Sequence, residues 1–203
     1  MSKIKDIQFK DLKEALDKTE ELYGESTAYV FKTEKEGVFK TISHKEVRDE
    51  VKGLGTKLID MGLKNKRIAV ISENRYEWGI AYLSIVTGTG IVVPLDKLLQ
   101  EKELENLMIR AEVEAIFYSQ KYDEVMKNIK EAGNTNIKYY ISMDLGNSTD
   151  TIYSQKELIK NGMDLLKLGD RRFRKLVRWK NKWIKNQQKG KTPFVDFFCL
   201  LNI

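Results

Sequence analysis

The chain has 203 residues, of which 41% are hydrophobic, 10% aromatic and 33% charged, as in a globular protein with one cored domain. Its single cysteine, Cys199, excludes an intrachain disulfide and a cysteine-based zinc site, and its single histidine, His44, excludes a histidine cluster. Any metal site would need carboxylates and carbonyls, which suit magnesium better than zinc. This cysteine usage favours a cytoplasmic protein.

The positive net charge is concentrated at one end of the chain. The formal net charge is +6, but ten Lys or Arg and one acid, Asp196, lie from Arg171 onward. The preceding 170 residues therefore carry 26 basic and 29 acidic residues. We interpret the chain as a mildly acidic body followed by a strongly basic tail.

The first elements are predicted to be a helix, a β-hairpin and a second helix. Residues 9–23 form an amphipathic pattern in which Leu12, Leu16 and Leu22 share one face. Alternating β-branched and aromatic residues predict hairpin strands at 27–33 and 38–42. The next helix is defined by a capping box of Ser43 and Glu46, close-packing glycines at Gly53 and Gly55, and a stop at Gly62.

Buried strands and helices then alternate. Short apolar runs predict strands covered on both faces, and the helix after the first of them is apolar on nearly every side. Asn74 is predicted to cap that helix, and Leu104, Leu107 and Met108 to face inward from the next one. Ser154 and Glu157 form a second capping box, which opens a helix through about Leu166. The predicted strands are 67–72, 91–93, 115–119 and 137–142, and the predicted helices between them are 74–87, 101–110 and 122–132.

Two glycine-containing segments fail as phosphate-binding motifs. Thr87-Gly88-Thr89-Gly90 has Val93 where a dinucleotide fingerprint needs its third glycine, and it follows a helix instead of a strand. We interpret it as a helix stop with a tight turn. Gly190-Lys191-Thr192 would need a glycine at position 185, which is Lys185.

The scattered aspartates give no sign of a catalytic pair. We expect them to be solvated or to cap helices, because their spacing places no two carboxylates on one face. His44 is predicted to be a surface residue at a helix start. From the sequence we assign no catalytic, cofactor-binding or metal-ligating residue. The aspartates in question are Asp144, Asp150, Asp164 and Asp170.

The basic tail allows two interpretations. Trp179, Trp183 and neighbouring apolar residues could share one face of a basic helix that binds an anionic membrane or nucleic acid. The composition changes abruptly and no acid occurs over 171–191, which favours sequence produced by truncation or a frameshift. We divide the chain into a body, 1–173, and a tail, 174–203.

Residues 41–119 carry a specific resemblance. The segment 65–78, NKRIAVISENRYEW, resembles the "GDRVAIISENRPEW" stretch of AMP-forming ligases, with Tyr76 in place of the usual proline. Val92-Val93-Pro94-Leu95 resembles their "VVPL" strand end. Similarity also covers 41–47 and 101–119, and it extends over about 9–173. The body is most similar to the N-terminal part of long-chain fatty-acid–CoA ligases of the AMP-binding, adenylate-forming superfamily.

The resemblance implies a function for a full-length relative. Such an enzyme uses ATP and Mg²⁺ to form an acyl-adenylate from a fatty acid, and then transfers the acyl group to coenzyme A. The family's phosphate loop, adenine-binding segment, ribose-binding aspartate and C-terminal lysine have no counterpart in these 203 residues. The resemblance therefore implies a truncated ligase without cofactors of its own, inactive alone or completed by a second polypeptide.

The element order predicts an α/β fold. Repeated helix–strand units at this spacing form a partial parallel sheet with helices on both faces, joined to an N-terminal helix and β-hairpin. The alternative function is a non-catalytic binding module that contacts a membrane peripherally, or nucleic acid, through the basic tail.

Overall fold

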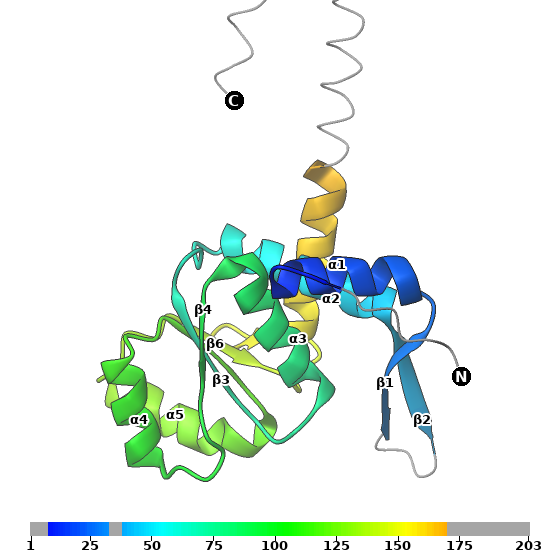
Figure 1. The fold of residues 1–203 in the computed structure, drawn as a ribbon. Helices are drawn as coiled ribbons and strands as arrows, with labels where there is room; N and C mark the ends of the chain where they lie inside the picture. The colour runs from blue at the N-terminus through cyan, green and yellow to red at the C-terminus, as the bar shows by residue number, and fades with distance from the viewer. Residues whose placement is uncertain (1–7, 33–37, 170–203) are drawn as a thin grey trace, which may run out of the picture. The chain divides into compact units, whose positions relative to one another are not determined.

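A computed structural model describes residues 8–32 and 38–169. The chain divides into two compact units, Met1–Leu165 and Leu166–Ile203, and the hairpin, the sheet and the candidate site described below lie in the first. The predicted basic tail lies outside the described residues. The predicted α/β architecture is confirmed: an N-terminal helix and hairpin are followed by a parallel sheet covered by helices (Figure 1).

The N-terminal part matches its prediction closely. Asp11 caps α1 (Leu12–Tyr23) by accepting a hydrogen bond from the Glu14 amide at 2.8 Å. The strands β1 (Thr27–Lys32) and β2 (Phe39–Ser43) pair antiparallel as the predicted hairpin. The helix α1 has no fully buried residue: Leu16 packs against the core, whereas Leu12 and Leu22 are exposed.

The helix α2 (His44–Asp60) begins at the predicted capping box. The Ser43 amide donates to Glu46 Oε2 at 2.7 Å, and the Glu46 amide donates to Ser43 Oγ at 3.2 Å. Both hydrogen bonds satisfy amides that the first helical turn would otherwise leave unpaired. Because this start is fixed locally, the sequence alone was sufficient to predict it.

The central sheet has five parallel strands in the order β4-β3-β5-β6-β7. The strand β4 lies at an edge and is only partly buried, with Ile91 55% exposed, so the prediction of a fully buried strand there is wrong. The two-residue strand β7 was not predicted. The strands are β3 (Arg67–Ile71), β4 (Ile91–Pro94), β5 (Ala115–Tyr118), β6 (Tyr139–Ser142) and β7 (Tyr153–Ser154).

Helices cover both faces of this sheet, as a parallel sheet requires. The helices α2 and α3 lie on one face and α4 and α5 on the other (Figure 1). A further helix covers residues 155–169 and packs on the α2 face through Leu158. The remaining helical segments are α3 (Tyr76–Ser84), the π-helical turn η1 (Ile85–Thr89), α4 (Glu101–Arg110), the 3₁₀ turn η2 (Gln120–Tyr122) and α5 (Asp123–Ala132).

Three predicted details of these helices are wrong. Arg75, not Asn74, occupies the N-cap position of α3, in an extended conformation and without a side-chain capping bond. Leu107 is 41% exposed, whereas Leu104 and Met108 are buried. The predicted second capping box forms only in part: the Glu157 amide donates to Ser154 Oγ at 3.3 Å, but the Glu157 carboxylate accepts from the Ser148 amide at 2.6 Å.

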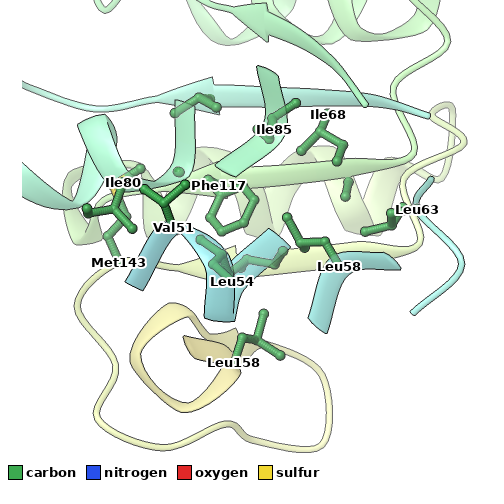
Figure 2. Packing of buried hydrophobic residues seen from close by; sticks show 14 of the residues in the cluster. Val51, Leu54, Leu58, Leu63, Ile68, Ile80, Ile85, Phe117, Met143 and Leu158 are labelled. Atoms are coloured by element: carbon green, nitrogen blue, oxygen red, sulfur yellow. The ribbon is translucent and has the colours of Figure 1, made fainter. Parts of the chain in front are cut away.

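The larger core lies between the sheet and the helices α2, α3 and 155–169. Figure 2 shows Leu54 and Leu58 of α2 pointing toward Phe117 of β5, and Leu158 approaching α2 from the other side. These four side chains are at most 2% exposed. Burial of each contributes about 1.5–3 kcal/mol relative to an exposed position. This core fixes α2 and helix 155–169 against the strands whose ends form the candidate site.

The predicted close packing at the α2 glycines is confirmed. A Cβ on Gly53 would lie 2.8 Å from the Ile159 carbonyl oxygen, and one on Gly162 would lie 1.8 Å from the Gly53 carbonyl oxygen. A Cβ on Gly55 would lie 3.1 Å from Thr89 Oγ1. The α2 backbone therefore directly contacts helix 155–169 at a pair of glycines.

Candidate functional site

The candidate site lies at the carboxyl edge of the sheet, where the chain changes direction. After β3 the chain continues into α3 on one face, and after β5 it continues into η2 and α5 on the opposite face. Because β3 and β5 are neighbours, their ends diverge to opposite sides of the sheet. In open α/β sheets, ligands bind in the crevice that such a divergence creates.

Arg75 connects three segments at this edge. Its Nε donates to Glu77 Oε2 at 2.8 Å, and its Nη1 donates to Asp144 Oδ1, after β6, at 2.7 Å. Burial alone would lower the Arg75 pKa, but the hydrogen bonds to Glu77 and Asp144 outweigh it and raise the pKa above its ordinary value. The guanidinium thus remains charged and fixes the ends of β3 and β6 relative to each other.

A second contact joins the ends of β3 and β5. Ser119 Oγ donates to Glu73 Oε2 at 2.7 Å, and the Gln120 amide donates to Asp144 Oδ2 at 2.6 Å. Burial would raise the Glu73 pKa, but the hydrogen bonds from Ser119 and from its own backbone amide lower it below its usual value. The expectation that Asp144 is merely solvated or capping is therefore wrong.

A groove of about 330 Å³ lies beside this cluster, on the α2 side. The hairpin, α2, the start of α3, the loop after β6 and the start of helix 155–169 supply its walls. Its lining residues are Phe31, Lys40, Ile42, Glu50, Arg75, Tyr76, Glu77, Met143, Asp144, Leu145, Gly146, Gln155, Lys156 and Ile159.

Glu50 and Tyr76 form a hydrogen bond in the wall of the groove. The Tyr76 hydroxyl donates to Glu50 Oε2 at 2.5 Å, and the Tyr76 ring stacks on Phe31 with centroids 5.6 Å apart. Burial raises the Glu50 pKa despite the hydrogen bond from Tyr76. Burial and the contact with Glu50 likewise raise the Tyr76 pKa, so the phenol remains protonated.

Gln155 has one atom whose hydrogen-bonding capacity is unmet. Its side chain is 2% exposed, and Nε2 donates to the Glu77 carbonyl oxygen at 2.9 Å. Its Oε1 is buried and has no partner among the described residues. Leaving a buried acceptor unpaired costs about 1–3 kcal/mol.

A larger hollow of about 610 Å³ lies on the opposite face, between α5 and the strands β5 and β6. Lys130 extends across it, with Nζ donating to the Thr151 carbonyl at 3.0 Å and lying 5.1 Å from the centre of the Tyr140 ring. The hollow is therefore bridged by a side chain of the same molecule. It contains no group that the sequence analysis singled out.

The hydrogen bonds and ion pairs of this edge hold the ends of β3, β5 and β6 together. Over residues 8–32 and 38–169, no group of three or more His, Cys, Asp or Glu could hold a metal ion. In the same part of the chain, no helix has the length and apolar character that crossing a membrane requires. Asp170, Cys199 and the tail tryptophans lie outside the described residues.

The Thr87–Gly90 segment is a turn, as predicted. Gly88 has φ +136°, and the Gly90 amide donates to the Ile85 carbonyl oxygen as the chain enters β4. The segment precedes a strand, so it lies at the amino edge of the sheet, away from the Arg75 cluster.

Trp78 and Tyr82 stack at 5.1 Å, and Trp78 packs against the core.

The sequence analysis did not identify the Arg75 cluster or the Gln155 acceptor. Arg75 and Asp144 are 69 positions apart, so no local pattern connects them. One signal was available: a polar residue follows within two positions of each observed strand end at Ile71, Tyr118 and Ser142. Parallel strands bring such residues to one edge of a sheet.

Comparison with known proteins identifies relatives among long-chain fatty-acid–CoA ligases. The curated long-chain-fatty-acid–CoA ligase 5 of Mus musculus is 28% identical over 137 residues, covering 65% of this chain and 20% of the relative. The Rattus norvegicus protein of the same name gives the same values. The chain therefore spans about a fifth of these relatives.

Solved structures share the fold. A long-chain-fatty-acid–CoA ligase from Archaeoglobus fulgidus superimposes with a TM-score of 0.62 at 18% identity, covering 74% of this chain and 29% of that one. The anthranilate CoA ligase AuaEII, in complex with anthranoyl-AMP, gives 0.65 at 17% identity, covering 76% and 29%. The family model described as AMP-binding enzyme matches residues 16–179, most of the chain. By this match and by its fold, the chain belongs to the AMP-binding enzyme family.

Proposed function

We propose that the chain is the N-terminal part of an ATP-dependent, AMP-forming long-chain fatty-acid–CoA ligase. The family match over residues 16–179 carries this proposal, and the similarity to two curated long-chain ligases supports the substrate class. The complete enzyme would form an acyl-adenylate and then an acyl-CoA. The polypeptide of residues 1–203 would be inactive by itself, and its compartment would be the cytoplasm.

The described residues do not fit ATP and Mg²⁺. At the carboxyl edge, three carboxylates surround the single Arg75 guanidinium, a charge arrangement that disfavours a triphosphate. The glycine turn Thr87–Gly90 lacks the pattern of a phosphate-binding motif and lies at the opposite edge. We therefore assign nucleotide and coenzyme A binding to the parts of a full-length ligase that this chain does not match.

The role of this chain would be to build and fix the sheet. The Arg75 ion pairs and the Glu73–Ser119 hydrogen bond hold the ends of β3, β5 and β6 together. Such a preformed edge would position the remainder of a ligase, supplied by the same or a completing polypeptide, around the fatty acid.

Palmitate-dependent ATP–pyrophosphate exchange tests the proposed inactivity. We expect no exchange with purified residues 1–203, and robust exchange with full-length mouse long-chain ligase 5 as the positive control. Exchange by the short chain above a no-enzyme blank would contradict the proposal.

A chimera tests the proposed ligase role directly. Residues of this chain that match mouse ligase 5 would replace the corresponding 137-residue stretch of that enzyme. We expect palmitoyl-CoA synthesis to persist, and to fall in a chimera that also carries Arg75→Ala. A folded chimera without synthesis would count against the assignment of this chain to a ligase.

A further inference from the structure

The groove beside α3 has wall groups that the ligase proposal does not use. At about 330 Å³ it lies at the lower end of the range for small-molecule pockets. Both Glu50 and Gln155 contact the first turn of α3, Glu50 through the Tyr76 hydroxyl and Gln155 through the Glu77 carbonyl. Two side chains on different elements therefore meet the first turn of α3, Glu50 at a side-chain hydroxyl and Gln155 at a backbone carbonyl.

Both acceptors have hydrogen-bonding capacity that no described residue fills. Gln155 Oε1 is buried without a partner. Glu50 receives one hydrogen bond from Tyr76 and forms no ion pair within the described residues, although its side chain is half-buried. A half-buried carboxylate and a buried amide oxygen are both satisfied by a group that donates several hydrogen bonds and carries positive charge.

The other wall groups limit what this cation can belong to. The side chains of Lys40 and Lys156 also line the groove, and Lys156 makes no ion pair among the described residues. A polyamine would be repelled by these lysines, whereas a ligand that also carries a carboxylate would be attracted. Arg75 pairs with both Glu77 and Asp144, so these three wall groups together keep one net negative charge.

We propose that this groove binds a small zwitterion, with its ammonium group on Glu50 and Gln155 Oε1 and its carboxylate toward Lys40 and Lys156. Because Gln155 Oε1 needs a hydrogen-bond donor, the ligand must carry one. Because the charges of the lining residues balance, the ligand should be neutral overall. The proposal uses no catalytic property of a ligase, so it holds whether or not the chain is part of one.

Binding of β-alanine to the isotope-labelled full chain, followed by NMR, tests this proposal. Ethylamine supplies the cation alone and propionate the anion alone. We expect saturable shifts of the Gln155 side-chain amide with β-alanine, at least tenfold weaker binding of ethylamine, and no binding of propionate. Absence of saturable shifts with β-alanine, or equal affinity for all three probes, would overturn it.

Variants distinguish binding at this groove from general effects of substitution on the protein. Gln155→Met removes the unpaired acceptor at similar volume, and Glu50→Gln removes the charge while a hydrogen bond from Tyr76 can persist. Each should weaken β-alanine at least tenfold. Glu124→Gln, in the hollow beside α5, should leave binding unchanged. If Gln155→Met does not fold, Glu50→Gln alone decides, and unchanged affinity there contradicts the proposal.

Discussion

Ser43 and Glu46 show how two side chains determine where α2 begins. Replacing Ser43 with alanine removes the acceptor for the Glu46 amide, which lies 3.2 Å from Ser43 Oγ. We expect Ser43→Ala to lower the free energy of unfolding by about 1 kcal/mol. Urea denaturation followed by circular dichroism measures this change.

A matched variant isolates the capping effect. Ser43→Thr retains the hydroxyl, so it should retain most of the stability that Ser43→Ala loses. If Ser43→Ala and Ser43→Thr lower the free energy of unfolding equally, the capping box would not be the source of the effect.

Glu50 makes stability depend on pH in a defined direction. Its folded-state pKa is raised by burial above the ordinary value of 4.5, so the folded protein holds this proton more tightly than the unfolded chain. The contribution of Glu50 is fully present below about pH 4.5 and is lost as the pH rises through the folded pKa. Glu50→Gln should therefore be more stable than the wild-type protein at pH 7.

Paired urea titrations from pH 4 to pH 8 check this prediction. The stability difference between Glu50→Gln and wild type should grow with pH and become constant above the folded pKa. A difference that is constant over the whole range would show that the carboxyl titrates equally in both states.

The packing of α2 against helix 155–169 depends on the contact between Gly53 and Gly162. A methyl group at residue 162 would lie 1.8 Å from the Gly53 carbonyl oxygen, which is backbone and cannot rotate away. Gly162→Ala must therefore separate α2 from helix 155–169, and we expect a loss of about 3 kcal/mol. Thermal unfolding measures it.

Gly146→Ala is the appropriate control, because a Cβ at residue 146 would meet nothing within 4 Å. Its stability should stay within about 0.5 kcal/mol of the wild-type value. Equal melting temperatures for Gly162→Ala and Gly146→Ala would show that the two helices do not pack as described.

The elements predicted from sequence were those that local chemistry determines. The Ser43 capping box, the hairpin and the turn at Gly88 each depend on residues a few positions apart. Asn74 failed as a cap because Arg75 is held extended by Glu77 and by the distant Asp144. The charged cluster and the Gln155 acceptor arise only when strands far apart in sequence become neighbours, so no local pattern indicates them.

At the scale of the whole molecule, the open edge of β4 offers a surface on which other chains can pair. No strand among the described residues pairs with its outer side, and Ile91 is 55% exposed. Pro94 removes one backbone donor at its far end. An apolar sheet edge promotes edge-to-edge pairing, which a lysine disrupts.

We expect Ile91→Lys to lower light scattering of concentrated protein relative to wild type. Leu22→Lys, on the exposed surface of α1 and away from the sheet, should have little effect. Equal reduction by both variants would attribute the change to added charge instead of to the edge.

The central position of β3 has a consequence for how the protein is made on the ribosome. β3 is the first strand of the sheet to be synthesised, but it pairs with β5 through a register that ends at Tyr118, about 50 residues later. At roughly 5–20 residues per second, several seconds pass before that partner has been translated. During this interval the nascent chain presents the apolar Ile68–Ile71 backbone without its final neighbour, so a chaperone would encounter this segment first.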